Sequence, residues 1–269
     1  MLWAYRRGQS TPTRQSPVNT AVRSQFNTFT DDSGEENSQV EVLLGLIEGE
    51  AAPLIRRIVA TPDSFNLSDR RALAVFLGIM GTRTVKRRRV AAEAALRIIR
   101  AHLEDFLKDD ARFLPSLAEY NKERGKTLEA EQLRSSILNE EGIRLAITKP
   151  GQIAYAFSAA STLAGWLETM PWALIEAPPS AEFVTSDSPL VILAEPSPMN
   201  PEDDFPTEKV EVTFPIDPKH CLLIKPKGPT GPHLAPRAYV EEVVRRTVEE
   251  SEKEVYCAHM SPIVARLLD

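Results

Sequence analysis

The sequence of 269 residues has few of the residues that build disulfide frameworks and metal centres. Its two cysteines, Cys221 and Cys257, lie far apart and match neither a zinc-binding spacing nor a disulfide pattern. The four histidines are scattered, and no two of them have the spacing of metal ligands. This scarcity argues against a disulfide-stapled scaffold and predicts no histidine metal site. It also favours a reducing, cytoplasmic setting.

Motifs for catalysis, cofactor binding and targeting are also missing. The sequence contains no Gly-x-Ser-x-Gly nucleophile motif, no phosphate-binding glycine loop and no dinucleotide fingerprint, so no cofactor is assigned. Arg6 and Arg7 stand near the N-terminus, but no apolar segment follows them, and a signal peptide is therefore not predicted. The longest uncharged run, Gly151 to Leu167, is short for a membrane span and predicts a buried helix.

The charge balance of the chain is acidic. Charged residues make up 26% of the sequence, and the net charge is −6 at pH 7. Such a balance gives no support to nucleic-acid binding. A basic run does occur at Lys86 to Arg89, but no aromatic residues interleave with it as base-stacking platforms would. Because consecutive residues of a helix cannot share one face, we expect Lys86, Arg88 and Arg89 to be solvated.

Arg83 differs from the rest of the basic cluster. It continues the apolar helical stripe that begins at Phe76, which turns its side chain inward. A buried guanidinium needs a carboxylate partner. We therefore predict that Arg83 is mostly buried and lies within ion-pair reach of Glu41, Glu48 or Asp187.

Hydrophobic periodicity divides the chain into three regions. Strands are predicted within residues 1–30, helices within 38–168, and strands with a C-terminal helix within 171–269, all in a single domain over residues 1–269. The long helix after Ser68 contains Gly78 and Gly81, which predict close packing or a bend. The acidic, proline-rich segment from Glu195 to Thr207 predicts an exposed loop. The expected fold is α+β, with a central helical region packed on a mixed or mainly antiparallel sheet formed by N- and C-terminal strands.

The most distinctive stretch is Thr185-Ser186-Asp187-Ser188-Pro189, which lies between two apolar runs. The flanks predict buried strands, and Pro189 restricts Ser188 to an extended backbone. We expect a rigid strand–turn–strand that aims Ser186 and Asp187 out of a sheet. Two interpretations stay open. These residues form an acid–base or metal-binding pair, or Asp187 bonds nearby backbone amides and only shapes the turn, and the spacing favours the second.

Several stretches occur in the order typical of an uncharacterised, mainly bacterial family. They are Leu2-Trp3-Ala4-Tyr5, the early helix with Glu41 and Glu48, Phe76-Leu77 leading to Arg83-Thr84, Trp172, Phe183 to Pro189, Phe214 to Pro218, and Val255-Tyr256. In these stretches, which span most of the chain, the sequence resembles the family catalogued as domain of unknown function 4238. The Ser-Asp-x-Pro turn after an apolar strand is the most telling piece. The resemblance implies no activity, substrate or partner.

The sequence departs from the family pattern at three places. Members typically have a His-Tyr-Val-Pro-Gln segment that would precede Met1, a glutamine where this chain has Met80, and an asparagine where it has Val243 and Val244. If the family has an active site, the opening histidine is a natural member of it, and its absence argues against activity. Without that segment, the apolar strand from Leu2 is expected to lack a neighbour and to leave an unpaired sheet edge. Two causes stay open, a reading frame started too late or a truncated N-terminus, and the first is favoured.

Two classes of function follow from these observations. The first is a non-catalytic or degenerate member of the family, in which the residues around Ser186 and Asp187 are a structural polar network. The alternative is a hydrolase-like enzyme whose site contains Asp187, Ser186, Arg83, Glu48 and Glu41. In that enzyme a carboxylate and a hydroxyl activate water, and a guanidinium holds an anionic group. The missing histidine and glutamine favour the non-catalytic class, and the sequence assigns no metal, membrane or other partner.

Overall fold

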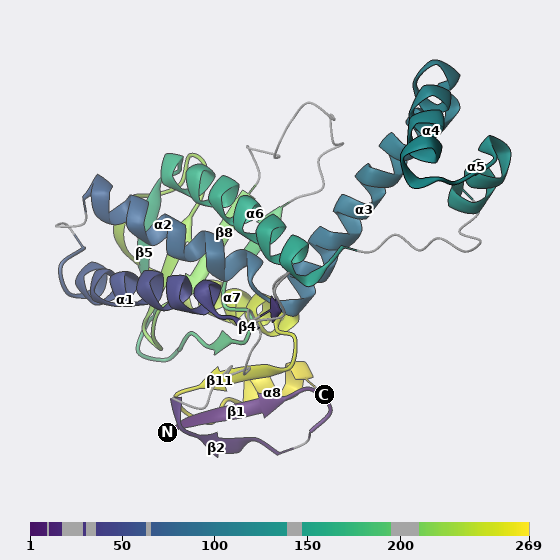
Figure 1. Cartoon of the computed structure of the whole chain (residues 1–269). Coiled ribbons are helices and arrows are strands. Elements are labelled where there is room, and N and C mark those ends of the chain that lie inside the picture. Colours follow the sequence, from purple (N-terminus) through teal and green to yellow (C-terminus); the bar gives the residue numbers. More distant parts are fainter. Residues whose placement is uncertain are drawn as a thin grey trace. The chain divides into compact units, whose positions relative to one another are not determined.

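The structure is a computed structural model and describes residues 1–9, 11–17, 29–30, 36–62, 66–138, 147–194 and 210–268 (Figure 1). The chain divides into two compact units. The first comprises Met1–Arg87 and Ala156–Asp269, and the second comprises Arg88–Tyr155. The single domain expected for residues 1–269 stays a prediction. The loop predicted from Glu195 to Thr207 lies outside the described residues.

The described residues form an α+β fold, as the sequence predicted. The helices are α1 (Gln39–Ala60), α2 (Leu67–Thr82), α3 (Val85–Lys108), α4 (Asp110–Arg124), α5 (Ala130–Leu138), α6 (Lys149–Thr169), α7 (Arg237–Glu250) and α8 (Pro262–Leu268). The strands are β1 (Leu2–Arg6), β2 (Thr13–Gln15), β3 (Phe29–Thr30), β4 (Glu36–Asn37), β5 (Trp172–Glu176), β6 (Thr185–Ser186), β7 (Val191–Ala194), β8 (Val210–Pro215), β9 (His220–Ile224), β10 (Gly231–Leu234) and β11 (Glu254–Cys257).

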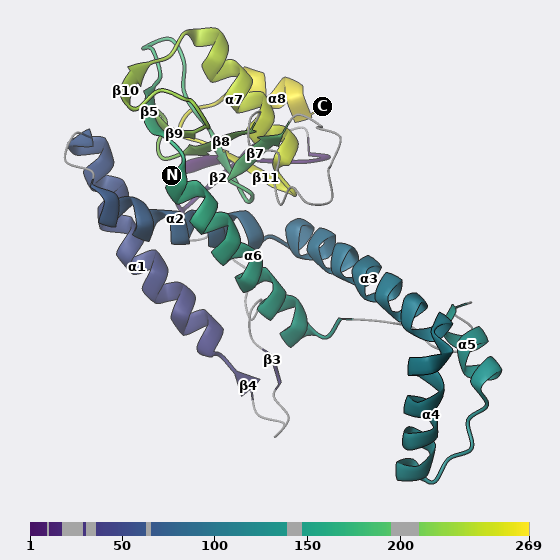
Figure 2. The ribbon, with the colours of Figure 1, turned by 90° about the horizontal axis from the view of Figure 1, so that it is seen from above.

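A five-stranded sheet forms the centre of the first unit. Its strand order is β10-β5-β9-β8-β7, and β10 runs parallel to β5 while the other neighbours are antiparallel. Side chains of β5 alternate between the two faces, because successive residues of a strand point in opposite directions. Trp172 and Leu174 pack with α1, α2 and α6, whereas Ala173 and Ile175 pack with α7. The sheet is therefore covered by helices on both faces, as Figure 2 shows.

A second sheet joins the two ends of the chain. Its order is β2-β1-β11-β6, with antiparallel neighbours throughout. The chain turns at Gly8, where φ is +75°, and β2 returns alongside β1. Trp3 lies opposite Arg14 on one side and Cys257 on the other. The expectation that the strand from Leu2 lacks a neighbour is thus wrong, because the turn at Gly8 supplies one. The segment expected upstream of Met1 stays a prediction.

Helix α7 is shared by the two sheets. Val240 and Val243 pack with the five-stranded sheet. Val244 and Val248 pack with β11 and with α8. Two apolar stripes of one helix therefore place α7 between two hydrophobic clusters, and the change from one cluster to the other falls at the middle of the helix.

The long helix predicted after Ser68 is divided in the structure. It separates at Arg83 and Thr84 into α2 and α3, after the two glycines that predicted close packing or a bend. A Cβ atom on Gly78 would lie 2.4 Å from the carbonyl oxygen of Ala160 in α6. The glycine therefore allows the α2 and α6 backbones to approach more closely than any side chain would permit.

The second compact unit has a small helical core of its own. Leu107, Phe113 and Leu117 are buried there. The rings of Phe106 and Phe113 pack edge to face, with their centroids 5.9 Å apart. Helix α4 begins at the N-cap Asp109, whose carboxylate accepts a hydrogen bond from the amide of Ala111. It ends at a left-handed glycine, the residue type that stops a helix without steric cost.

The basic run is only partly solvated. Arg89 is exposed, as predicted, and its Nε lies 3.8 Å from Glu93 Oε1. Arg88, however, is buried, so the prediction of a solvated side chain is wrong for this residue. Because successive helical residues are about 100° apart, three consecutive arginines cannot all face solvent once one side of the helix is covered. The side chain of Lys86 lies outside the described set.

Candidate functional site

The Thr-Ser-Asp-Ser-Pro stretch connects the two sheets. Strand β6 belongs to the four-stranded sheet, and β7, which follows the turn, belongs to the five-stranded sheet. Ser186 is buried, and its hydroxyl accepts a hydrogen bond from the amide of Ser188 at 3.1 Å. The expectation that Ser186 is aimed out of a sheet is therefore wrong. It closes a local turn inside the protein, as serines before such turns often do.

The carboxylate of Asp187 binds the backbone that leads into β11. Oδ1 accepts a hydrogen bond from the amide of Glu252 at 2.9 Å, and Oδ2 accepts from the amides of Lys253 at 2.8 Å and Glu254 at 3.4 Å. The Asp187 amide donates to the carbonyl of Glu254 at 3.1 Å. Burial raises the pKa of Asp187, and the three backbone hydrogen bonds oppose that rise. Asp187 thus binds backbone amides, but these amides lie far away in the sequence and not in its own turn.

Arg7 binds the other end of the same segment. We call residues 248–254, from the last turn of α7 to the first residue of β11, the α7–β11 connection. The Nη2 of Arg7 donates to the carbonyl of Val248 at 2.5 Å, and its Nε donates to the carbonyl of Ser251 at 3.4 Å. Val248 lies in the last turn of α7, where its carbonyl also accepts a hydrogen bond from the hydroxyl of the C-cap Ser251 at 2.6 Å. A guanidinium at a helix C-terminus also interacts favourably with the helix dipole. Arg7 and Asp187 together satisfy the backbone of this connection.

Arg83 and Glu48 form the ion pair that the sequence predicted. The pair links the end of α2 to α1, because Arg83 is the C-cap of α2. Its setting differs from the prediction, since the Arg83 side chain is 33% exposed and that of Glu48 is 49% exposed. Glu41 lies in the first turn of α1, about two turns away from Glu48. The predicted site residues therefore make two separate sets of contacts. Arg83 pairs with Glu48, whereas Ser186 and Asp187 accept hydrogen bonds from backbone amides.

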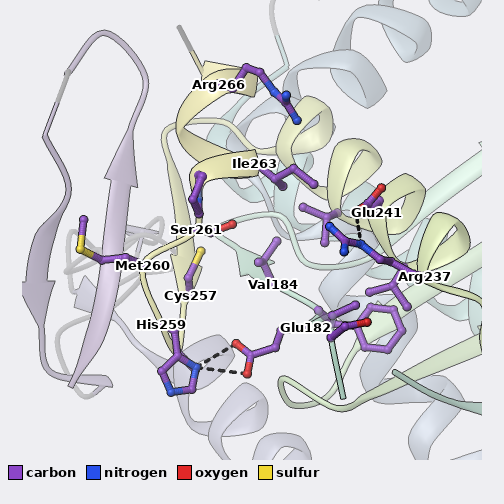
Figure 3. Close-up of a pocket in the computed structure, with 17 residues that line it drawn as sticks. Glu182, Val184, Arg237, Glu241, Cys257, His259, Met260, Ser261, Ile263 and Arg266 are labelled. Atoms are coloured by element: carbon purple, nitrogen blue, oxygen red, sulfur yellow. Dashed lines mark hydrogen bonds and ion pairs between the residues drawn. The ribbon is translucent and has the colours of Figure 1, made fainter. Parts of the chain in front are cut away.

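A pocket of about 620 Å³ lies beside the turn, in the first unit (Figure 3). It is lined by residues 180–184, the first half of α7, residues 257–263 and Arg266. The buried lining side chains are Phe183, Val184, Val240, Val244 and Cys257. Some belong to the hydrophobic cluster of the five-stranded sheet and the others to the cluster of the four-stranded sheet. The apolar floor is therefore the seam between the two cores.

Charged side chains surround this floor. His259 Nδ1 lies 2.9 Å from Glu182 Oε2, and Lys219 Nζ lies 3.9 Å from Glu182 Oε1. Arg237 Nε donates to Glu241 at 2.7 Å. Arg266 is exposed, and within the described part of the chain it has no ion pair. In Figure 3 Arg266 lies at the top of the pocket and the His259–Glu182 pair at the bottom.

Two pocket residues with nucleophilic groups, Cys257 and Ser261, have structural roles. Burial, together with the negative charge of Glu182, raises the pKa of the Cys257 thiol to about 12, so it is protonated at neutral pH. The Ser261 hydroxyl accepts a hydrogen bond from the amide of Val264 at 3.4 Å, and the Ser261 amide donates to the Tyr5 hydroxyl at 2.8 Å. Neither group is paired with a general base, which nucleophilic catalysis requires.

The residues that the structure describes contain no group of three or more His, Cys, Asp or Glu side chains that could hold a metal ion. In the same ranges, the helices are too short or too polar to cross a bilayer.

Sequence reasoning did not find the pocket. Its rim pairs Glu182 with His259, which are 77 positions apart, so no local spacing links them. The amphipathic pattern of α7 and the apolar run before Thr185 were visible, but both patterns are equally typical of an ordinary core. Only the packing of α7 between two sheets turns these stretches into the walls of one cavity.

The fold and the pocket define an α+β protein with a five-stranded and a four-stranded sheet, a helix shared between these two sheets and a small-molecule-sized cavity at their seam. The chain belongs to the family of proteins of unknown function DUF4238, because the sequence model of that family matches residues 1–259. No curated protein matches the chain. No solved structure matches it either.

Proposed function

We propose that this protein is a non-catalytic binding protein whose small-molecule ligand occupies the pocket at the seam of the two sheets. The observation that carries the proposal is the combination of a cavity of about 620 Å³, an apolar buried floor and a charged rim. Ligand sites are typically concave, of about 300–1,000 Å³, mostly apolar, and supplied with a few polar groups that fix orientation.

The contacts of Asp187 support a binding protein over a hydrolase. A carboxylate that activates water needs a lone pair directed at that water. Both oxygens of Asp187 instead accept hydrogen bonds from backbone amides of the α7–β11 connection. Arg83 is paired with Glu48 on α1. In this proposal, the Ser186–Asp187 turn positions β11 and α7, which are two walls of the pocket.

We place the protein in the bacterial cytoplasm. Cys221 and Cys257 are both free and buried, which suits a reducing compartment. The bacterial source rests on the family resemblance.

A fragment screen by protein-observed NMR tests the proposal. Fragments should shift the amide resonances of residues around Val184, Val244 and Ala258, which line the pocket. Ala258→Trp should abolish these shifts, because an indole at this partly exposed position fills the cavity.

The matched control is Ala52→Trp, which adds the same indole at an exposed site on α1. This variant should bind the same fragments as the wild-type protein. Fragments that shift no pocket resonance, or that bind Ala258→Trp and wild type equally, would contradict the proposal. Thermal melts of both variants establish that the comparison is made between folded proteins.

A further inference from the structure

We infer that the ligand of this pocket is an amphipathic monoanion, with a carboxylate at Arg266 and an apolar body on the floor. The inference rests on the proposed function, because it names the class of ligand that the same pocket takes. The argument depends on the charge balance of the rim, the chemistry of the floor and the position of Arg266.

The carboxylates of the rim are already compensated. Glu182 lies next to both His259 and Lys219, and Glu241 accepts a hydrogen bond from Arg237. Neither carboxylate is therefore available as the main partner of a cationic ligand. Binding a cation here would require an existing ion pair to be broken, which costs the interaction and the desolvation of both groups.

Arg266 is the rim cation whose charge stays uncompensated within the described residues. Its side chain extends from α8 on the pocket side of the helix, above Ile263 in Figure 3. A guanidinium presents parallel N–H donors that match the two oxygens of a carboxylate. Among the described residues of the rim, Lys219, Arg237 and Arg266 stand against Glu182 and Glu241, which leaves one positive charge in excess in a chain with a net charge of −6.

A single guanidinium favours a carboxylate over a phosphate. A phosphate monoester carries up to two negative charges and offers three acceptor oxygens, so its sites usually contain several donors. The other arginine of the pocket, Arg237, is held by Glu241 and has its Nε occupied. The rim thus matches one negative charge and two acceptor oxygens.

The floor selects for an apolar body attached to the carboxylate. Phe183 and Val240 come from one hydrophobic cluster, and Val184 and Val244 come from the other. These side chains offer no hydrogen bond, so polar groups of a ligand placed over them would be desolvated without compensation. An aromatic or branched aliphatic body can lie over them without leaving a polar group uncompensated.

Three probes of similar size test the inference by isothermal titration calorimetry at low salt. They are 1-naphthylacetate, 1-naphthylacetamide and 2-(1-naphthyl)ethylammonium, which share an aromatic body and differ in charge. The carboxylate should bind about tenfold or more tightly than the amide, since the guanidinium forms a bidentate ion pair with a carboxylate and only a single hydrogen bond with a neutral amide oxygen. The ammonium should bind most weakly.

Arg266→Gln should bring the affinity for the carboxylate to that of the amide and leave the affinity for the amide unchanged. Arg56→Gln is the matched control, because Arg56 is an exposed arginine of α1 away from the pocket. It should keep the preference for the carboxylate. A preference that survives in Arg266→Gln would overturn the inference.

The outcomes also separate this inference from the proposed function. Equal affinity for the three probes, abolished by Ala258→Trp, would overturn the anionic ligand and leave a binding pocket in place. Fragment hits in the pocket that are all neutral or cationic would have the same consequence. Absence of binding by the three probes, together with a fragment screen without pocket hits, would overturn the proposed function itself.

Discussion

Arg7 and Asp187 hold one connection of the chain from its two ends. The guanidinium of Arg7 donates to carbonyls at Val248 and Ser251, which end α7. The carboxylate of Asp187 accepts from amides of residues 252–254, which lead into β11. A cation thus binds carbonyl groups and an anion binds amide groups of one short segment. The connection fixes α7 and β11 relative to each other, and both line the pocket.

Replacing Arg7 should destabilise the protein more than replacing its neighbour. Arg7→Met removes the donors to the end of α7, with an expected loss of about 1–3 kcal/mol in the free energy of unfolding. Arg6→Met removes only a partly exposed ion pair with Glu254 and should cost less than about 1 kcal/mol. Urea denaturation of both variants measures the difference. Equal losses would show that Arg7 acts only as a surface charge.

Replacing Asp187 by asparagine should lower stability and change its pH dependence. Asp187→Asn keeps the shape but replaces one acceptor oxygen by a donor that faces backbone amides, with an expected loss of about 1–3 kcal/mol. The pKa of Asp187 is raised above the ordinary value of 3.8, so the folded protein binds this proton more tightly than the unfolded chain does. The stabilisation that comes from this bound proton is therefore fully present below pH 3.8 and is lost as the pH rises through the raised pKa.

Denaturation of wild type and Asp187→Asn on both sides of that pH window isolates the effect, because the variant cannot ionise at this position. The stability advantage of wild type should be larger on the acidic side. An advantage that grows as the pH rises would mean that the pKa of Asp187 is lowered in the folded state.

Gly78→Ala should destabilise the contact between α2 and α6. The added Cβ would lie 2.4 Å from a backbone oxygen of Ala160, and a backbone cannot yield as a flexible side chain does. We expect a loss of about 1–3 kcal/mol. Gly45→Ala in α1 is the control, because no atom lies within 4 Å of its added Cβ, and alanine should stabilise that helix by about 0.5–1 kcal/mol. Changes of the same sign in the two variants would contradict the close packing.

The Arg83–Glu48 ion pair should contribute little to stability. Both side chains are partly exposed, so solvent screens their attraction. A double-mutant cycle with Arg83→Ala and Glu48→Ala should give a coupling free energy below about 1 kcal/mol. A coupling of about 3 kcal/mol or more is typical of a buried pair, and it would mean that the pair is sealed from solvent.

The Cys257 thiol should react slowly in the folded protein. Its pKa of about 12, against an ordinary value of 9.0, lowers the thiolate fraction near neutral pH by about a thousandfold. Alkylation by iodoacetamide, followed by mass spectrometry of the peptides, should modify Cys257 and Cys221 only when urea is present. Modification of Cys257 in native protein at the rate of the unfolded chain would show that the floor of the pocket is open and polar.

The sequence alone determined the elements whose signals are local. The α+β class and the division into a helical middle and strand-bearing ends follow from hydrophobic periodicity and turn residues, which act over a few positions. The backbone-binding interpretation of Asp187 was favoured for the same reason, since short polar side chains in turns commonly bond amides. Gly78 was also informative, because a glycine in a helix interior is unfavourable unless a close contact requires it.

The tertiary structure decided which distant groups meet. Arg83 had three candidate carboxylates, and the packing of α2 on α1 selected Glu48. Asp187 bonds amides 65 to 67 positions away, and Glu182 meets a histidine 77 positions away. No covalent spacing relates such groups, because long-range proximity is set by how α7 packs between two sheets. The pocket exists only at that seam, so its residues carry no shared signal in the sequence.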